Sequence, residues 1–288
     1  MKDFPIPVVG IGPGSQTEDD TLAYMPMPQG MDTFHHPSLP EADEVADCRA
    51  ARELLARAVE LLGPVGQGGP NQHLDLRLLP AADLRLINQV LGEGEVSARV
   101  LSQGDDQHET RVQESVFAGV WRVVHLVNGQ AVEDSLELGP VPEVLRQAAG
   151  QDARPPLPVW DGPLPPNVQN APALLAEVED QIALWQPGQP SHVINLTLLP
   201  MSDEDIGFLD HHLGTGRVLI LSRGYGNCRI TNACRPHVWR VVYYNSQDVV
   251  ILNTVEVGAL PEVAQAAAED LADSRERLHE VLQWVSGT

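Results

Sequence analysis

The sequence predicts an α+β protein built from two tandem copies of one domain, each ordered helix-strand-helix-four-strand-helix with its helices packed on a largely antiparallel sheet. The first supporting observation is that short segments recur in the same order about 120 residues apart, a period too long for a solenoid unit. The second is that clustered strand-type runs follow a helix-strand-helix start in both halves. The recurring pairs are 78–80 with 198–200, 91–94 with 213–216, 120–124 with 238–242, 137–139 with 256–258, and 142–144 with 261–263.

The chain divides naturally into an arm, two repeat domains and a linker. Its 288 residues allow two domains of roughly 110 to 120 residues, each able to bury a core. We expect the first repeat domain at residues 41–150 and the second at residues 171–288. Residues 151–170 contain six prolines and no period, which indicates a stiff Pro-rich linker. Residues 1–40 form an extended Met/Pro-rich N-terminal arm, which either docks onto a partner or lies across its own domain.

In the first copy, helices are predicted from apolar stripes with a period near 3.6 and strands from alternation. Residues 41–62 carry such a stripe, and Gly63-Pro64 is expected to end that helix. Residues 74–78 alternate apolar and polar side chains, which indicates a strand. The remaining elements are a helix at 81–91, strands at 96–100, 110–116, 120–127 and 132–138, and a helix at 142–149.

The second copy repeats this order. Ser202 and Asp205 have the spacing of a capping box, so a helix is expected to begin there. The final helix is longer than its counterpart, and Leu271, Leu278 and Val285 fall seven residues apart along a stripe for burial. The predicted elements are helices at 173–185, 202–212 and 261–285, and strands at 192–199, 217–222, 227–233, 238–244 and 249–257.

Composition excludes several classes of partner. The formal charge is −22, from 18 basic and 40 acidic side chains, and such a surface repels nucleic acid and anionic membranes. The charge either serves solubility alone or attracts a basic partner peptide. Three cysteines make no disulfide framework and indicate a reducing compartment. With neither a signal-peptide core nor a membrane-length apolar run, a cytoplasmic protein without membrane insertion is expected.

The second copy differs from the first in charge. Residues 211–247 hold no acid, five arginines and three histidines, whereas residues 94–127 hold five acids against three arginines. One interpretation is a local positive site for an anion, a carboxylate-bearing segment or a C-terminus. The alternative is that these arginines pair with acids from elsewhere in the fold.

A turn with unusual side chains lies inside this stretch. The Gly-Tyr-Gly-Asn sequence at 224–227 joins two strand-type runs and would present Tyr225 between Arg223 and Arg229. Residues 102–108 keep a turn in the first copy but lack the aromatic, both arginines and the cysteine. We therefore expect partner binding in the second copy. The candidate residues are Arg223, Tyr225, Asn227, Cys228, Arg229, Arg235, His237 and Trp239.

Metal binding and catalysis have weaker support. Cys228, Cys234 and His237 have no established zinc or iron–sulfur spacing. On one regular strand the two sulfurs would lie about 20 Å apart, so only a break near Thr231-Asn232 would let them share a metal. The alternative is that both are inert thiols. No catalytic motif is visible, so an enzyme is not expected.

Several segments resemble the signature of the HupH/HyaF family of hydrogenase expression/formation proteins. They are residues 24–31, 222–230, 238–242 and 256–263, and the resemblance extends over nearly the whole chain. It implies an accessory protein that helps to mature a [NiFe] uptake hydrogenase and is absent from the final enzyme. It further implies action before export on the small-subunit precursor, which carries iron–sulfur clusters and a twin-arginine signal, beside a thioredoxin-like accessory maturation protein.

Two functional hypotheses follow. The first is an assembly chaperone that binds the immature small subunit, with the acidic surface favouring its basic export signal. The second is an iron–sulfur carrier or thiol redox helper for the same client, acting through Cys228 with Cys234 or Cys48. No resident cofactor is expected in either case, and a transient iron–sulfur cluster belongs only to the second.

Overall fold

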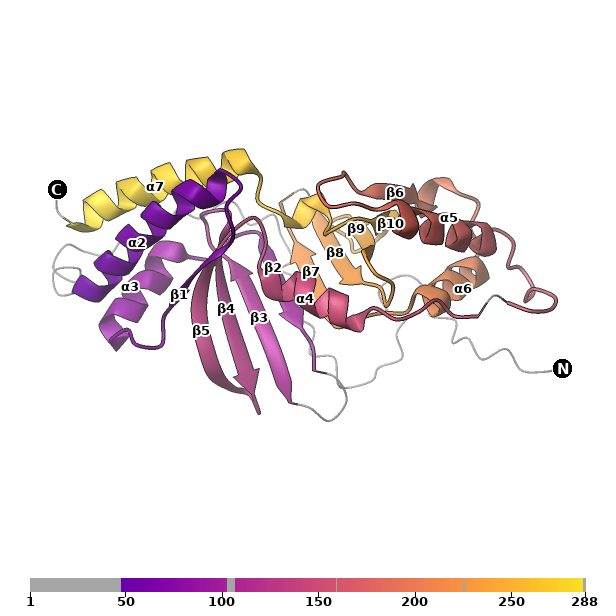
Figure 1. Cartoon of the computed structure of the whole chain (residues 1–288), viewed down its shortest axis with the longest axis horizontal. Helices are drawn as coiled ribbons and strands as arrows, with labels where there is room; N and C mark the ends of the chain where they lie inside the picture. The colour runs from indigo at the N-terminus through magenta and orange to yellow at the C-terminus, as the bar shows by residue number, and fades with distance from the viewer. Residues whose placement is uncertain (1–47, 103–106, 159, 225, 287–288) are drawn as a thin grey trace. The chain divides into compact units, whose positions relative to one another are not determined.

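The structure is a computed structural model that describes residues 48–102, 107–158, 160–224 and 226–286. The predicted arm at 1–40 and the turn residue Tyr225 lie outside the described residues. The chain forms two compact units (Figure 1). We call the described residues within 33–146 and 262–288 the early unit, and the described residues from 147 to 261 the late unit.

In its described residues, the early unit is an antiparallel sheet of five strands with the helices α2, α3 and α7. Its strand order is β1-β5-β4-β3-β2. Apolar residues of the helices pack on one face of this sheet, which gives the α+β class expected from the sequence. Its elements are α2 (Arg49–Gly66), β1 (Gln72–Asp75), α3 (Ala81–Leu91), β2 (Val96–Val100), β3 (His108–Glu114), β4 (Val120–Val127), β5 (Gln130–Leu138) and α7 (Ala268–Ser286).

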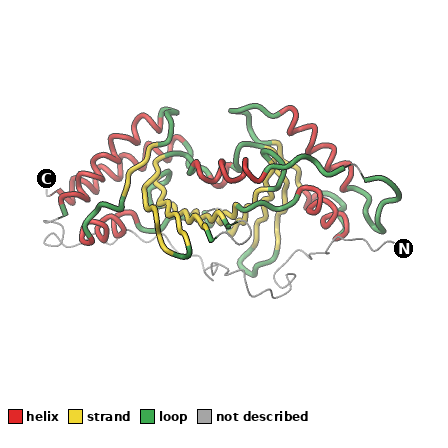
Figure 2. The backbone as a smooth tube through the Cα atoms, turned by 60° about the horizontal axis from the view of Figure 1, so that its bottom comes forward, coloured by secondary structure: helices red, strands yellow, loops and turns green. Residues whose placement is uncertain are grey.

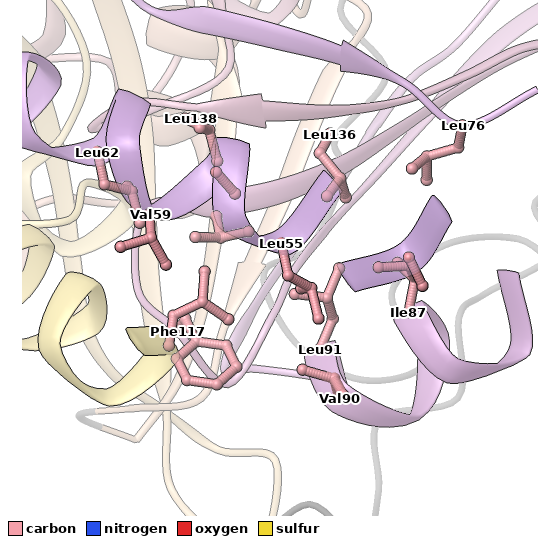
Figure 3. Packing of buried hydrophobic residues seen from close by; sticks show 14 of the residues in the cluster. Leu55, Val59, Leu62, Leu76, Ile87, Val90, Leu91, Phe117, Leu136 and Leu138 are labelled. Carbon is pink, nitrogen blue, oxygen red and sulfur yellow. The ribbon is translucent and has the colours of Figure 1, made fainter. Parts of the chain in front are cut away.

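The core of the early unit lies between α2, α3 and β5 (Figure 3). Leu55 and Ile87 have no exposed surface, and fully burying a side chain of this size contributes about 1.5–3 kcal/mol. The helical stripe read from the sequence therefore faces the sheet. The labelled members of this cluster are Leu55, Val59, Leu62, Leu76, Ile87, Val90, Leu91, Phe117, Leu136 and Leu138.

Helix α7 completes the core of the early unit, although the sequence analysis assigns it to the second domain. It runs beside α2 (Figure 1), and Leu271, Leu278 and Val285 are buried in the early-unit cluster. Gly119, with φ +78°, lies so close to Leu271 that any Cβ there would collide with it. The expected domain of residues 171–288 thus differs from the observed grouping, because a stripe shows that a helix is buried but not against which sheet.

The late unit has the same kind of sheet, with strand order β7-β8-β9-β10-β6. Helices α5 and α6 contribute to its buried cluster together with strand residues such as Val238 and Val255. Figure 2 shows the helices of each unit set against its strands. Its elements are the last residues of α4 (Glu143–Asp152), α5 (Ala171–Leu184), β6 (His192–Asn195), α6 (Asp203–Leu213), β7 (Val218–Ser222), β8 (Asn227–Asn232), β9 (Val238–Tyr244) and β10 (Val250–Val257).

Local predictions hold for several elements, but the final helix, predicted from residue 261, begins at Ala268 after a short 3₁₀ helix (Glu262–Ala264). Ser202 accepts a hydrogen bond from the Asp205 N–H at 2.9 Å, and the capping box at the start of α6 is confirmed. The prediction that α2 ends at Gly63 was wrong. The helix continues to Gly66, because Val65 is buried in the core, and this last turn contains Pro64. The predicted strand at 74–78 was too long, since Leu78 is exposed in the turn after β1.

Two other segments also differ from their predictions. The predicted strand at 192–199 ends at Asn195, where a short 3₁₀ helix (Leu196–Leu198) begins. The linker predicted at 151–170 begins two residues later, because α4 extends to Asp152, and its described residues from 153 on form no helix or strand. Its Val168 is nevertheless buried in the late-unit core, so this end of the segment packs against its own unit.

Glu114, at the end of β3, is a buried acid whose carboxyl group loses its proton less readily than an exposed one. Only 7% of its surface is exposed, and its Oε1 accepts a hydrogen bond from the Gly119 N–H at 3.3 Å. Burial raises the pKa of Glu114 to about 7, although hydrogen bonds from the Gly119 and Val96 N–H groups act in the opposite direction. The carboxyl therefore titrates near neutral pH.

Glu114→Gln is expected to reduce the loss of stability that the protein shows as pH rises. The folded-state pKa lies above the ordinary value of 4.5, so the free energy of unfolding falls as pH rises through about 7. The fall due to this group between pH 5 and pH 8 is about 2 kcal/mol, because each unit of pKa difference corresponds to about 1.4 kcal/mol. Urea unfolding of both proteins at the two pH values tests this, and an identical pH dependence would contradict it.

Candidate functional site

The β7–β8 hairpin carries the turn singled out by the sequence. Ser222 faces Cys228 across the two strands, and Gly226 adopts φ +99°, which the glycine allows without strain. Arg223 is exposed, and Asn227 and Arg229 are half-buried. The predicted presentation of Tyr225 between the two arginines lies outside the described residues.

Three of the five arginines in the acid-free stretch meet acids from other elements. Arg217 Nε donates to Asp152 Oδ1 at 2.6 Å, Arg235 Nε donates to Glu179 Oε1 at 2.7 Å, and Arg240 lies 3.3 Å from Asp210. In the described ranges, neither Arg223 nor Arg229 has an ion pair. Each interpretation of the stretch therefore holds for some of its arginines. Three arginines pair with acids of the same unit, whereas Arg223 and Arg229 keep their charge for a partner.

The candidates after the hairpin mostly lie inside the late unit. Arg235 is 6% exposed and also donates to the Arg154 carbonyl oxygen. His237 is exposed and stacks on Trp185 with ring centroids 3.7 Å apart, and partial burial lowers its pKa. Trp239 is 1% exposed. Of these three, only His237 offers surface to a macromolecular partner.

The cysteines have the properties of structural thiols. Cys228 is 3% exposed beside Tyr243 on β9, and burial raises its thiol pKa to about 12, so the thiolate is scarce at neutral pH. Strand β8 pairs with β9 in continuous register through Thr231 and Asn232. The strand therefore has no break there that would bring the Cys228 and Cys234 sulfurs together. Burial also raises the pKa of Cys234. The described residues contain no group of three or more His, Cys, Asp or Glu side chains arranged for a metal ion.

A cavity of about 220 Å³ lies between the C-terminal end of α6 and the face of the late-unit sheet. It brings together Arg229 from β8 and Arg240 from β9, with Asp210 of α6 beside them. Asp210 and Thr215 are exposed, so the cavity opens to solvent near the end of α6. Its other polar lining residues include Thr231, Asn232, Tyr244 and Asn253.

Two buried polar atoms of the cavity lining make no hydrogen bond within the described residues. Asn253 Oδ1 has no hydrogen-bond partner, and Asn253 is only 6% exposed. Arg240 Nη1 makes no hydrogen bond either, although it lies 3.3 Å from Asp210 Oδ1. Buried polar groups without hydrogen bonds are uncommon in folded proteins, so these two mark a candidate site.

Sequence reasoning selected Arg229 and Trp239 from this cavity but missed Asp210, Tyr244 and Asn253. A signal was present in the strand that directly follows each Val-Trp-Arg-Val-Val segment. Asp134 faces Val124 in the early unit, and Asn253 faces Val242 in the late unit. An acid-to-amide difference at matched positions distinguishes the two halves.

Comparison with known proteins gives a consistent result. The family described as "HupH hydrogenase expression protein, C-terminal conserved region" matches residues 48–155 and again residues 168–285. The chain is 52% identical to the hydrogenase expression/formation protein HoxQ of Cupriavidus necator, and the match covers 99% of both chains. It is 46% identical to HupH of Rhodobacter capsulatus, again over 99% of both. It is 36% identical to the hydrogenase-1 operon protein HyaF of Escherichia coli, over 96% of this chain and 95% of that one.

The strength and extent of these matches settle the family. Together the two family matches span most of the chain, and the relatives align with it from end to end. In the described part of the chain, no helix combines the length and apolar character needed to cross a bilayer. The chain therefore belongs to the HupH family of hydrogenase expression/formation proteins, and its role lies in hydrogenase maturation.

Proposed function

We propose that the protein is a cytoplasmic assembly chaperone that binds the immature iron–sulfur small subunit of a [NiFe] uptake hydrogenase before export. The observation that carries this proposal is the β7–β8 hairpin. Arg223 is exposed and Arg229 half-buried there, in a stretch of 37 residues, 211–247, without an acid. A charged surface hairpin can engage a polar or anionic element of a client.

The net negative charge of the chain suits a basic segment of such a client. The chain has a net charge of −22, and acidic surface attracts a basic segment such as a twin-arginine export signal. A thioredoxin-like accessory maturation protein would act beside the chaperone on the same precursor. The protein would work without a resident cofactor and without catalysis, and the buried, high-pKa thiol of Cys228 favours this over a thiol redox helper.

We also infer that the two units descend from one duplicated domain. The same family region matches the chain twice, and the strand orders β1-β5-β4-β3-β2 and β6-β10-β9-β8-β7 are equivalent. The hairpin arginines have no equivalent pair in the early-unit turn at 102–108. On this account the late unit holds the binding site and the early unit supports it.

Charge reversal in the hairpin tests the proposal. The double variant R223E/R229E is expected to lower retention of the small-subunit precursor in co-purification by at least about tenfold, because it replaces two cations at the contact with anions. The matched control is R49E/R57E on α2, which changes the net charge equally on exposed side chains of the early unit. Retention by the control and loss by the hairpin variant support the proposal. Equal retention by both, or no retention by the unaltered protein, overturns it.

A further inference from the structure

The two units place an identical arginine in different surroundings. In the early unit, Arg122 on β4 donates to both oxygens of Asp134, at 3.0 and 2.7 Å, and also to Asn88 Oδ1. In the late unit, Arg240 Nη1 on β9 lies 3.3 Å from Asp210 Oδ1 and makes no hydrogen bond among the described residues. Arg122 is therefore held in a bidentate, hydrogen-bonded pair, whereas Arg240 has a looser single contact with its acid.

Strand register explains the difference. The position that Asp134 occupies opposite Val124 is occupied by Asn253 opposite Val242, so the late unit has an amide where the early unit has a carboxylate. The acid of the late unit stands instead on α6, as Asp210, and about half of its side chain is exposed to solvent. An acid shared with water is a weaker partner for a buried guanidinium than one fixed on the adjacent strand.

A second acid is replaced by an amide on the same face. In the early unit, Arg111 faces Val124, and its Nη2 lies 3.1 Å from Glu109. In the late unit, Arg229 faces Val242, and the position of Glu109 is taken by Asn227. Arg229 is left beside the Tyr244 hydroxyl, which lies within hydrogen-bonding reach. Two sheet carboxylates have thus become amides around the arginines that line the cavity.

We propose that this cavity is a binding site for a single carboxylate group. The carboxylate would lie beside Asn253, which stands where the early unit has Asp134, and would accept hydrogen bonds from Arg240 and Arg229. The site fits one negative charge rather than a phosphate dianion. Asp210 lies at the opening, and the carbonyl end of α6 carries a partial negative charge, so both oppose additional anionic charge.

The carboxylate can come from a free small acid or from a polypeptide, as a chain terminus or a side chain. A volume of about 220 Å³ equals that of about seven water molecules, which is room for the carboxyl end of either source. The site does not depend on the proposed client, because it follows from the two arginines that line a cavity within the late unit. It adds a ligand class to a protein that acts in hydrogenase maturation.

Isothermal titration of the full chain tests the site with three probes. These are butyrate, an acetyl-capped dipeptide with a free C-terminus, and the same dipeptide closed as an amide. Binding of at least one carboxylate probe, with at least about tenfold weaker binding of the amide, is the expected result. Butyrate binding identifies a free acid as sufficient, and binding of the peptide acid alone identifies a polypeptide source. Absence of binding by both carboxylate probes overturns the proposal.

A matched pair of variants separates this site from general charge effects. Asn253→Asp recreates the early-unit arrangement, so an internal carboxylate is expected to occupy Arg240, weaken probe binding at least about tenfold and raise the melting temperature. Asp134→Asn makes the reverse change in the early unit and is expected to leave probe binding unchanged. Equal effects of the two variants on binding, or unaltered binding by Asn253→Asp, would overturn the assignment.

Discussion

Asp152→Ala is expected to lower the free energy of unfolding of the late unit by about 3–5 kcal/mol, the range found when one partner of a buried ion pair is removed. Asp152, at the end of α4, is 4% exposed. Its carboxylate accepts from the backbone N–H and Nε of Arg217, both at 2.6 Å, and from Asn232 Nδ2 at 3.1 Å. The truncation leaves these donors without their common acceptor at the edges of β7 and β8.

The protonation of Asp152 adds a pH dependence with a defined sign. Burial alone would raise the pKa of Asp152, but the hydrogen bonds from Arg217 and Asn232 outweigh it and hold the pKa below its ordinary value. The stabilisation is therefore present above pH 3.8 and is lost as pH falls through the folded-state pKa. Asp152→Ala should lack this acid-dependent part.

Hydrogen exchange of β7 and β8, read beside urea unfolding, measures the effect of Asp152→Ala in the unit where it is expected. Asp75→Ala is the control, because Asp75 pairs with Arg77 on the exposed surface of the early unit, where ion pairs contribute little. Similar losses of stability in the two variants would show that the hydrogen bonds of Asp152 contribute no more than an exposed ion pair.

Leu278→Ala is expected to destabilise the early unit by about 2–5 kcal/mol, the range for truncating a buried leucine and leaving a cavity. Leu278 has no exposed surface and lies in one cluster with Leu55 and Leu62 of α2. Although it stands near the end of the chain, its loss should therefore be felt by residues about 220 positions earlier.

Exchange rates of the α2 and β8 amides distinguish the two possible locations of this effect. The account predicts faster exchange in α2 and little change in β8 for Leu278→Ala. Glu280→Ala, on the exposed face of the same helix, is the control for helix propensity. Faster exchange confined to β8 would mean that α7 belongs with the late unit, as the sequence order suggests.

Much of the local structure could be predicted because it depends on neighbouring residues. Strands β2, β4 and β9 have the predicted bounds, since alternation with β-branched residues and flanking turns defines each of them locally. The start of α6 followed from the spacing of Ser202 and Asp205. The family followed from segments that retain their order over the whole chain.

Long-range features were less accessible to the sequence. The stripe on α7 predicted burial but not its partner α2, because any apolar face can accept such a helix. The excess of arginines at 211–247 did not show that Asp152 and Glu179 neutralise two of them. The importance of Asn253 emerged only from strand register, since an asparagine in a strand has no signal of its own.

Hydrogenase maturation is expected to depend on the cationic hairpin of the late unit. The most direct test is to measure hydrogenase activity and small-subunit processing in cells whose only copy of this protein is R223E/R229E, beside cells that carry R49E/R57E. The account predicts unprocessed small subunit and little hydrogenase activity with the hairpin variant, and normal maturation with the α2 variant. Normal maturation with a stably folded R223E/R229E protein would contradict it.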